Sequence, residues 1–276
     1  ICCGGGVSDK PFSVDPFNHI LAADTDTRFK PAVEENLHTT FIELDLNDVT
    51  VQGFAKHVKE AGAEPGSNLH LTVCLCCKQA ASGEPINYAK YEEQIKKVIE
   101  IRNKLAASYT PTVFGEFLAI KRMVGLYQTW FKDADIVVLP ECGQENRTRM
   151  LIADGFKLTG LEDEVTARCA GAKTVTETTG AGKLRSNTGS QAKWKPTEEG
   201  IGSITTTGYK FMDTNGNVTQ LSKEVLMELR SQGAKHTYDL SMVSETLGRV
   251  IVGQAVSLVI AEVAAERCAT AHLDRW

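Results

Sequence analysis

The sequence lacks the features of secreted, membrane-spanning and disulfide-stapled proteins. No basic stretch leads into an apolar one near the N-terminus, so we expect no secretory signal. No apolar run approaches the roughly 20 residues that cross a bilayer. The eight cysteines, at positions 2, 3, 74, 76, 77, 142, 169 and 268, are too sparse and irregular for a small disulfide scaffold. These absences favour a reducing compartment, so we expect a cytoplasmic or nucleoid-associated protein.

The chain also lacks an excess of positive charge. The 30 Lys and Arg residues are outnumbered by 35 Asp and Glu, which gives a net charge of −5 and argues against a uniformly basic nucleic-acid binder. A local basic patch stays open. With 276 residues, of which 42% are hydrophobic, the chain suffices for one larger domain or for a domain with a smaller insert.

Short apolar runs alternate with amphipathic stretches in the first half of the chain. The apolar runs predict strands at 19–24, 39–46, 69–76, 111–118 and 134–140. The amphipathic stretches predict helices at 27–38, 51–62 and 88–108, and two more at 222–233 and 250–272. This order predicts an α/β fold with a Rossmann-like, mostly parallel sheet and helices on both faces.

The composition changes in the second half. Residues 166–197 are rich in Gly, Thr and Ser, and they contain six basic residues but only one acidic residue, Glu177. The basic residues are Arg168, Lys173, Lys183, Arg185, Lys193 and Lys195. We therefore divide the chain into residues 1–157, a small basic insert at 158–218, and residues 219–276, which return to the larger domain.

Small and acidic residues stand at successive strand ends. A run of three glycines, Gly4 to Gly6, opens the chain, Asp24 and Asp26 follow the strand at 19–24, and Asp45 follows the next. Ligands of parallel α/β sheets bind at the carboxyl ends of the strands, where glycines admit a nucleotide-like group and acids accept hydrogen bonds from ribose or adenine. Taken singly, the glycines could form an ordinary turn and each acid a solvated cap.

Three cysteines, at 74, 76 and 77, lie in or just after the strand at 69–76. A zinc site would need a second cysteine pair at a definite distance, which the sequence does not offer, and we predict no metal site. Cys74 fits the role of a small hydrophobe within a buried strand. Cys77 lies past the strand end, where a thiol can face a cleft, and this position favours a nucleophile.

The order of these motifs resembles that of the cytosine-5 DNA methyltransferases. The glycine run resembles the first motif of that family, and the Cys76-Cys77-Lys78 segment resembles its Pro-Cys-Gln nucleophile loop. Glu116-Phe117-Leu118 resembles its Glu-Asn-Val motif, and "QENRTRMLI" resembles its Gln-x-Arg-x-Arg motif. "LSKEVLMELRSQG" and "GRVIVGQAVSLVIAE" resemble its last two helical elements, and the basic insert stands where the family keeps its target-recognition domain.

The resemblance implies S-adenosylmethionine as the cofactor and double-stranded DNA as the partner, with the target base flipped out of the duplex. It implies these catalytic residues: Cys77, Glu116, Arg147 and Arg149. It implies these cofactor-binding residues: Cys2, Gly4, Gly6, Asp24, Thr25, Asp45, Leu46, Cys76, Gln254 and Val256. The six basic residues of the insert would contact nucleic acid.

The chain departs from the family pattern at three positions. Cys76 stands where the family has proline, and Phe117 and Gln254 stand where it has asparagine. Two classes of function therefore stay open: an active cytosine methyltransferase, or a methyltransferase-fold subunit that binds nucleic acid or a protein partner without catalysis. An RNA substrate and a modified methyl donor are lesser variants of the first class. Because the insert is short, we expect a short target site or a protein partner that assists target recognition.

Overall fold

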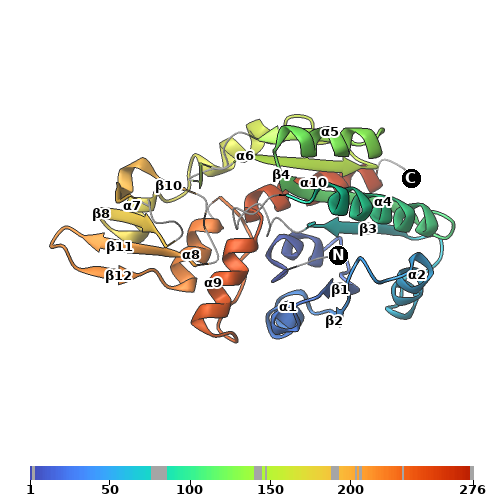
Figure 1. Ribbon diagram of the computed structural model, residues 1–276, viewed down its shortest axis with the longest axis horizontal. Coiled ribbons are helices and arrows are strands. Elements are labelled where there is room, and N and C mark those ends of the chain that lie inside the picture. Colours follow the sequence, from blue (N-terminus) through green and yellow to red (C-terminus); the bar gives the residue numbers. More distant parts are fainter. Residues whose placement is uncertain are drawn as a thin grey trace.

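The main body of the protein is an α/β structure, and a smaller lobe extends from it (Figure 1). The computed structural model describes residues 1, 4–75, 86–139, 145–146, 148–187, 193–202, 204, 207–231 and 233–273. All structural statements below concern these residues.

Six strands of the main body form two sheets. The larger sheet has the order β3-β4-β7-β5, and the smaller pairs β1 with β2 in parallel. Their bounds are β1 (Leu21–Asp24), β2 (Thr40–Glu43), β3 (Asn68–Val73), β4 (Thr110–Leu118), β5 (Asp135–Leu139) and β7 (Arg149–Asp154). β3 and β4 are parallel, whereas β7 runs antiparallel to both β4 and β5. The predicted α/β class is confirmed, with β7 as the reversed strand.

Helices cover both faces of the larger sheet. One face packs against α2 (Val51–Glu60), α4 (Tyr88–Leu105) and α5 (Lys121–Trp130). The other face packs against η1 (Val7–Ser13), α6 (Leu161–Cys169) and α10 (Leu258–Leu273). In α4 the buried residues are spaced three or four apart, so they form one apolar stripe toward the sheet: Tyr91, Ile95, Val98, Ile101 and Leu105.

A third apolar core joins the N-terminal region to the C-terminal region and the small lobe. It includes buried residues of α1 (Lys30–Leu37), which follows η2 (Thr27–Phe29), and of α8 (Lys223–Arg230) and α9 (Glu245–Gln254). Elements distant in sequence are therefore held together next to the three-glycine run.

The single helix that we expected at 250–272 is wrong, because the chain breaks after Gln254. Ala255 is extended, with φ −67° and ψ 148°, and α10 begins at Leu258. Val256 lies between the two helices and is buried in the core, which fixes the break. No single described helix is long and apolar enough to cross a membrane; α9 and α10 reach that length and composition only together, across a bend of 53°.

The small lobe is built on an antiparallel sheet with the order β12-β11-β8-β9. The strands are β8 (Gly182–Ser186), β9 (Lys195–Pro196), β11 (Tyr209–Asp213) and β12 (Val218–Gln220), with α7 (Val175–Thr179) and η3 (Thr197–Glu199) beside them. Leu184 and its partner Phe211 share the face that packs on the core around Leu226 of α8. A short parallel pair, β6 (Glu145–Asn146) with β10 (Ile201–Gly202), connects the lobe to the main body.

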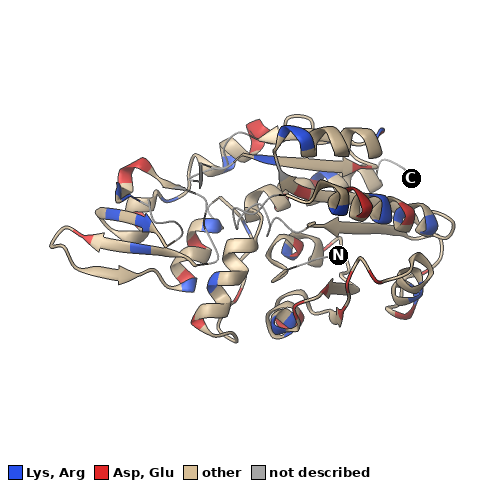
Figure 2. Cartoon of the chain, viewed as in Figure 1, with Lys and Arg blue, Asp and Glu red and all other residues tan. Residues whose placement is uncertain are grey.

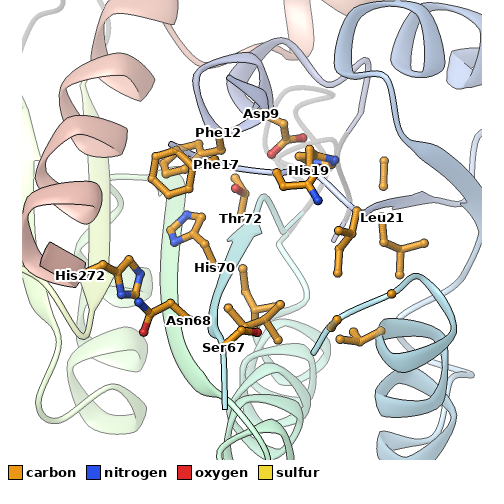
Figure 3. A pocket seen from close by; sticks show the side chains of 18 of the residues that line it. Asp9, Phe12, Phe17, His19, Leu21, Ser67, Asn68, His70, Thr72 and His272 are labelled. Carbon is orange, nitrogen blue, oxygen red and sulfur yellow. The ribbon is translucent and has the colours of Figure 1, made fainter. Parts of the chain in front are cut away.

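A cavity of about 530 Å³ lies between the two sheets and is lined by residues 21–23 of β1 and 68–72 of β3 (Figure 3). Ile1 pairs with β3 as a parallel strand would, donating to Thr72 O over 2.7 Å and accepting from Cys74 N over 3.3 Å. His70 faces the cavity beneath the stacked ring of Phe12, at 4.2 Å between ring centroids. The cavity also extends past the amino end of β3, because residues 62–64 and 67 line it as well.

The surroundings of His70 predict a pH dependence of stability. Burial, with smaller contributions from nearby positive groups, lowers the pKa of His70 from 6.5 to about 3. The folded state thus holds this ring neutral, while the unfolded state protonates it near its ordinary pKa. The contribution is complete above about pH 6.5 and is lost progressively as the pH falls toward 3.

We expect the unfolding free energy, measured by urea titration, to fall between pH 7 and pH 4 with a smaller slope in His70→Leu than in the wild type. His57→Gln, a substitution of a partly exposed histidine on α2, is the control and should keep the wild-type slope. Equal slopes in His70→Leu and the wild type would contradict the prediction.

Candidate functional site

The three-glycine run forms a turn that protein atoms enclose. Gly4 and Gly6 have φ angles of 54° and 74°, in the left-handed region that favours glycine. A Cβ atom on Gly5 would lie 2.3 Å from Ile251 of α9, so no side chain fits there. The turn thus packs its backbone directly against α9.

Asp24 ties the glycine turn to the carboxyl end of β1. Its Oδ2 accepts a hydrogen bond from Gly4 N over 2.8 Å, and its Oδ1 accepts one from Asp26 N over 3.0 Å. Thr25, between them, is exposed. Asp26 begins η2 and its carboxylate is bound by Arg28. Of the two acids, Asp24 is the one that contacts the turn.

Asp45 stands at the next strand end. The backbone N–H of Leu44 donates to Asp24 O over 3.0 Å, which brings the ends of β1 and β2 together. The Asp45 carboxylate accepts from both the backbone and the side chain of Asn47, over 2.8 and 2.6 Å. Leu46 is buried below it. The structure therefore places Gly4, Asp24 and Asp45 near the joined ends of β1 and β2.

Gln254 ends α9 beside the same turn. A Cβ atom on Gly4 would lie 3.4 Å from Gln254 Oε1, so this amide faces the first glycine. Val256, by contrast, is buried in the apolar core with α10 and shapes the break between the helices. Gln254 can present a polar group to a ligand on the turn, whereas Val256 supports the position of α9.

Glu116 and Arg149 form a buried ion pair between β4 and β7. Glu116 is 3% exposed and Arg149 is 6% exposed, and Arg149 Nε contacts Glu116 Oε1 directly. In the antiparallel register Leu118 lies opposite Arg149 and Leu151 opposite Glu116, so the two charged residues are diagonal neighbours on one face. Two charges this deep in a protein are stable only when they are paired.

Four predicted site residues lie outside the described residues: Cys2, Cys76, Cys77 and Arg147. Of the three cysteines considered for the nucleophile, only Cys74 is described, and it is half-buried one residue past β3. β3 ends with Val73 opposite Gly115, the neighbour of Glu116. The segment with Cys76 and Cys77 therefore follows the strand next to the Glu116–Arg149 pair. Among the described residues, no group of His, Cys, Asp and Glu side chains could hold a metal ion.

The basic residues of the insert divide into two groups. Arg168 lies on α6 and is held by Glu164 over 2.6 Å and by Glu266, and Lys173 is paired with Glu228 over 2.9 Å. α6 packs on α10, away from the small sheet. Both residues therefore already have acidic partners within the protein.

The other group lies on the small sheet (Figure 2). Lys183 and Arg185 alternate with buried Leu184, so they share the outer face, and Lys210 on β11 lies opposite Arg185 on that face. The guanidinium of Arg185 is 5.5 Å from the ring centre of Trp194. Lys195 is opposite Leu184 and so belongs to the other face, and Lys193 is exposed ahead of β9. The sequence analysis missed Lys210, which only the strand register places in this group.

Tyr238 is the other residue that the sequence analysis missed. It is buried, and its hydroxyl donates to the carbonyl of Gly5 in the glycine turn. The two residues are separated by 233 positions. No local pattern could have indicated this contact.

Comparisons with known proteins identify the fold. No protein-family model and no curated protein matches the sequence. Solved structures do match over nearly their whole length. One is the Dnmt2 methyltransferase of S. pombe, with 11% sequence identity and a TM-score of 0.63, over 98% of this chain and 97% of that chain. Another is the methyltransferase EhMeth of Entamoeba histolytica, with 10% identity and a TM-score of 0.61, over 99% of this chain and 96% of that chain. A third is described as an E. coli prophage-encoded DNA modification methyltransferase (10%, 0.62, 98% and 97%). The chain therefore has a methyltransferase fold.

The buried ion pair predicts a large effect on stability. Arg149→Met leaves Glu116 buried without its cation, so the unfolding free energy should fall by about 3–5 kcal/mol. Lys56→Met, which removes an exposed ion pair with Glu60 on α2, should change it by less than about 1 kcal/mol. The double variant Glu116→Gln/Arg149→Met should be more stable than Arg149→Met alone. Urea titration measures the unfolding free energy of the wild type and the three variants. Similar losses of free energy in Arg149→Met and Lys56→Met would show that the buried pair contributes no more to stability than an exposed one.

Proposed function

We propose that the protein transfers a methyl group from S-adenosylmethionine to carbon 5 of cytosine in DNA. The observation that carries this proposal is the buried Glu116–Arg149 pair beside the end of β3, the strand that Cys77 follows in the sequence, on a methyltransferase fold. The solved structures of similar fold include a Dnmt2 methyltransferase and a prophage DNA modification methyltransferase, which supports a nucleic-acid substrate.

The glycine turn and the acids beside it fit the methyl donor. Gly4 and Gly6 would lie against it, with the carboxylates of Asp24 and Asp45 next to its ribose and adenine and Gln254 next to the turn. Each Asp24 oxygen accepts one backbone N–H and retains a lone pair for a ribose hydroxyl. When bound, S-adenosylmethionine supplies a methyl group on a positively charged sulfur.

The chain's own residues would prepare the cytosine. The thiolate of Cys77 adds to carbon 6, and the electron pair of the 5,6 double bond makes carbon 5 nucleophilic. After methylation, loss of the carbon 5 proton and departure of the thiolate restore the double bond. Glu116 would hydrogen-bond to the ring at its N3 edge, while Arg149 fixes the position of that carboxylate. Arg147 is proposed to act with Arg149 in orienting the base.

The outer face of the small sheet would contact the DNA. Lys183, Arg185 and Lys210 present positive charge on that face, and Trp194 lies beside Arg185. Lysine and arginine bind phosphates without reading sequence, so this face would hold the duplex while the target base turns into the pocket. Because Arg168 and Lys173 are paired internally, the observations favour Lys183, Arg185 and Lys210 as the main contacts.

Trapping on 5-fluorocytosine tests the covalent step, because fluorine at carbon 5 prevents release of the enzyme. With S-adenosylmethionine present, the wild type should form an adduct that survives denaturing electrophoresis, Cys77→Ala should form none, and Cys76→Ala should still form one. Matched DNA and RNA oligonucleotides distinguish the two substrates.

If Cys76→Ala abolishes the adduct and Cys77→Ala does not, the nucleophile is one residue earlier. Binding of the wild type to DNA and RNA without any adduct would instead support the non-catalytic alternative. Adduct formation on RNA alone would overturn the DNA assignment.

Charge reversal on the small sheet tests the DNA-binding face. Lys183→Glu and Lys210→Glu should each weaken binding irrespective of sequence and reduce the slope of log K against log salt by about 0.9 for each phosphate that the variant no longer neutralises. Lys195→Glu is the matched control, because it reverses a charge on the opposite face of the same sheet. Fluorescence anisotropy at several salt concentrations measures the slope. If Lys195→Glu weakens binding as much or more, the binding surface lies elsewhere.

A further inference from the structure

A segment far from the glycine turn in sequence holds that turn in place. We call residues 235–240, which follow α8, the strap. Within it, Tyr238 is 5% exposed and its hydroxyl donates a hydrogen bond to Gly5 O. The same hydroxyl would be 3.6 Å from a Cβ atom on Gly6, so it lies against the second half of the turn.

Buried polar groups fix the first part of the strap to α10. The backbone N–H groups of Lys235 and His236 both donate to the carboxylate of Glu262, over 2.9 and 2.6 Å. Glu262 is fully enclosed, and His236 Nδ1 also lies 2.6 Å from one of its oxygens. A buried carboxylate bound in this way is costly to displace, so the strap enters from a fixed position.

The last part of the strap is fixed to α1 and α8. Asn36 and Asp239 exchange two hydrogen bonds, from Asn36 Nδ2 to Asp239 O over 2.8 Å and from Asp239 N to Asn36 Oδ1 over 2.7 Å. The buried Lys223 of α8 donates to Leu240 O over 2.7 Å. Tyr238 is thus held between two anchored segments, and its hydroxyl cannot move freely away from the turn.

The contact with Gly5 O determines the direction of another group in the turn. Gly5 O and Gly6 N–H belong to one planar peptide unit and point in opposite directions. A hydroxyl that holds the carbonyl therefore sets the orientation of the amide. On the other side of the turn, Asp24 holds Gly4 N. The glycines, which have the widest conformational freedom of all residues, are thereby fixed from both sides.

We propose that Tyr238 is a positioning residue for the methyl donor, which orders the Gly4–Gly6 turn before the donor binds. The inference rests on the proposed function, because it takes this turn as the donor site. Pre-ordering a binding loop increases affinity, since the bound ligand no longer has to fix the loop.

Tyr238→Phe removes only the hydroxyl and tests the proposal. Its Kd for S-adenosylmethionine, measured by calorimetry, should rise about fivefold to tenfold, as expected when one buried hydrogen bond is removed. Its Kd for duplex DNA should stay at the wild-type value. Without any donor, hydrogen exchange of amides in residues 4–12 should be faster than in the wild type.

Tyr109→Phe is the matched control. The hydroxyl of Tyr109 also donates to a backbone carbonyl, Ala63 O over 3.4 Å, but this contact precedes β4, at the opposite end of the strands from the turn. Tyr109→Phe should leave the donor Kd and the exchange of residues 4–12 unchanged, even if the melting temperature falls in both variants.

The outcomes separate the two proposals. If the wild type binds S-adenosylmethionine and Tyr238→Phe binds it equally well, the positioning role of Tyr238 is wrong. An equal fall in donor affinity in Tyr109→Phe would also overturn it, by attributing the effect to general destabilisation. If the wild type binds no S-adenosylmethionine, the proposed donor site fails. In that case, hydrogen exchange still tests the other proposal. If the amides of residues 4–12 exchange equally fast in Tyr238→Phe and in the wild type, Tyr238 does not order the turn.

Discussion

The constraint on which the proposed active site depends is the burial of two opposite charges on one face of a sheet. Glu116 and Arg149 are each almost fully enclosed, and neither charge would be stable there alone. The antiparallel pairing of β7 with β4 makes the contact, because it sets Arg149 diagonally across from Glu116. Phe117, between Glu116 and Leu118, packs on Tyr127 on the opposite face, at 4.2 Å between ring centroids. Phe117, one of the three departures from the cytosine-5 methyltransferase pattern, thus belongs to the apolar core on the face opposite the ion pair.

A second constraint acts at the three-glycine run. Its backbone packs closely against Ile251, Leu37 and Val33, which leave no room for a side chain on Gly5 and little for one on Gly6. Asp24 and Tyr238 then fix its N–H and C=O groups from the two sides. Residues from the two ends of the chain cooperate here, and this explains why a third core joins α1, α8 and α9. The ends of β1 and β2, the turn and α9 are therefore joined by direct contacts.

The sequence predicted β1 to β5 and the helices α1, α2 and α4, because each has a clear pattern, but it missed η1 and α5. Alternating apolar runs mark the strands, and the stripe on α4 marks a helix. The sequence-based prediction failed where tertiary packing determines the end of a helix. The chain breaks after Gln254, where Val256 is buried in the core, but the continuous apolar pattern of residues 250–272 gives no sign of this break. The resemblance to the cytosine-5 methyltransferases indicated Glu116 and Arg149 as catalytic residues; the structure shows that they form a buried ion pair, and their catalytic role stays a prediction. The sequence could not anticipate that Arg168 is paired with Glu266, because partners 98 residues apart leave no local pattern. The places of Cys77 and Arg147 in the site remain predictions.

The central claim is that this fold carries methyl transfer to carbon 5 of cytosine. Mass spectrometry of nucleosides tests it most directly, after the protein is incubated with unmethylated DNA and S-adenosylmethionine whose methyl group carries deuterium. The account predicts 5-methylcytosine with a mass increase for a fully deuterated methyl group, and no label on adenine or on the cytosine amino group. Label at either of those nitrogen positions would contradict the proposed chemistry, and the absence of label from DNA that the protein binds would contradict its assignment as an enzyme acting on DNA.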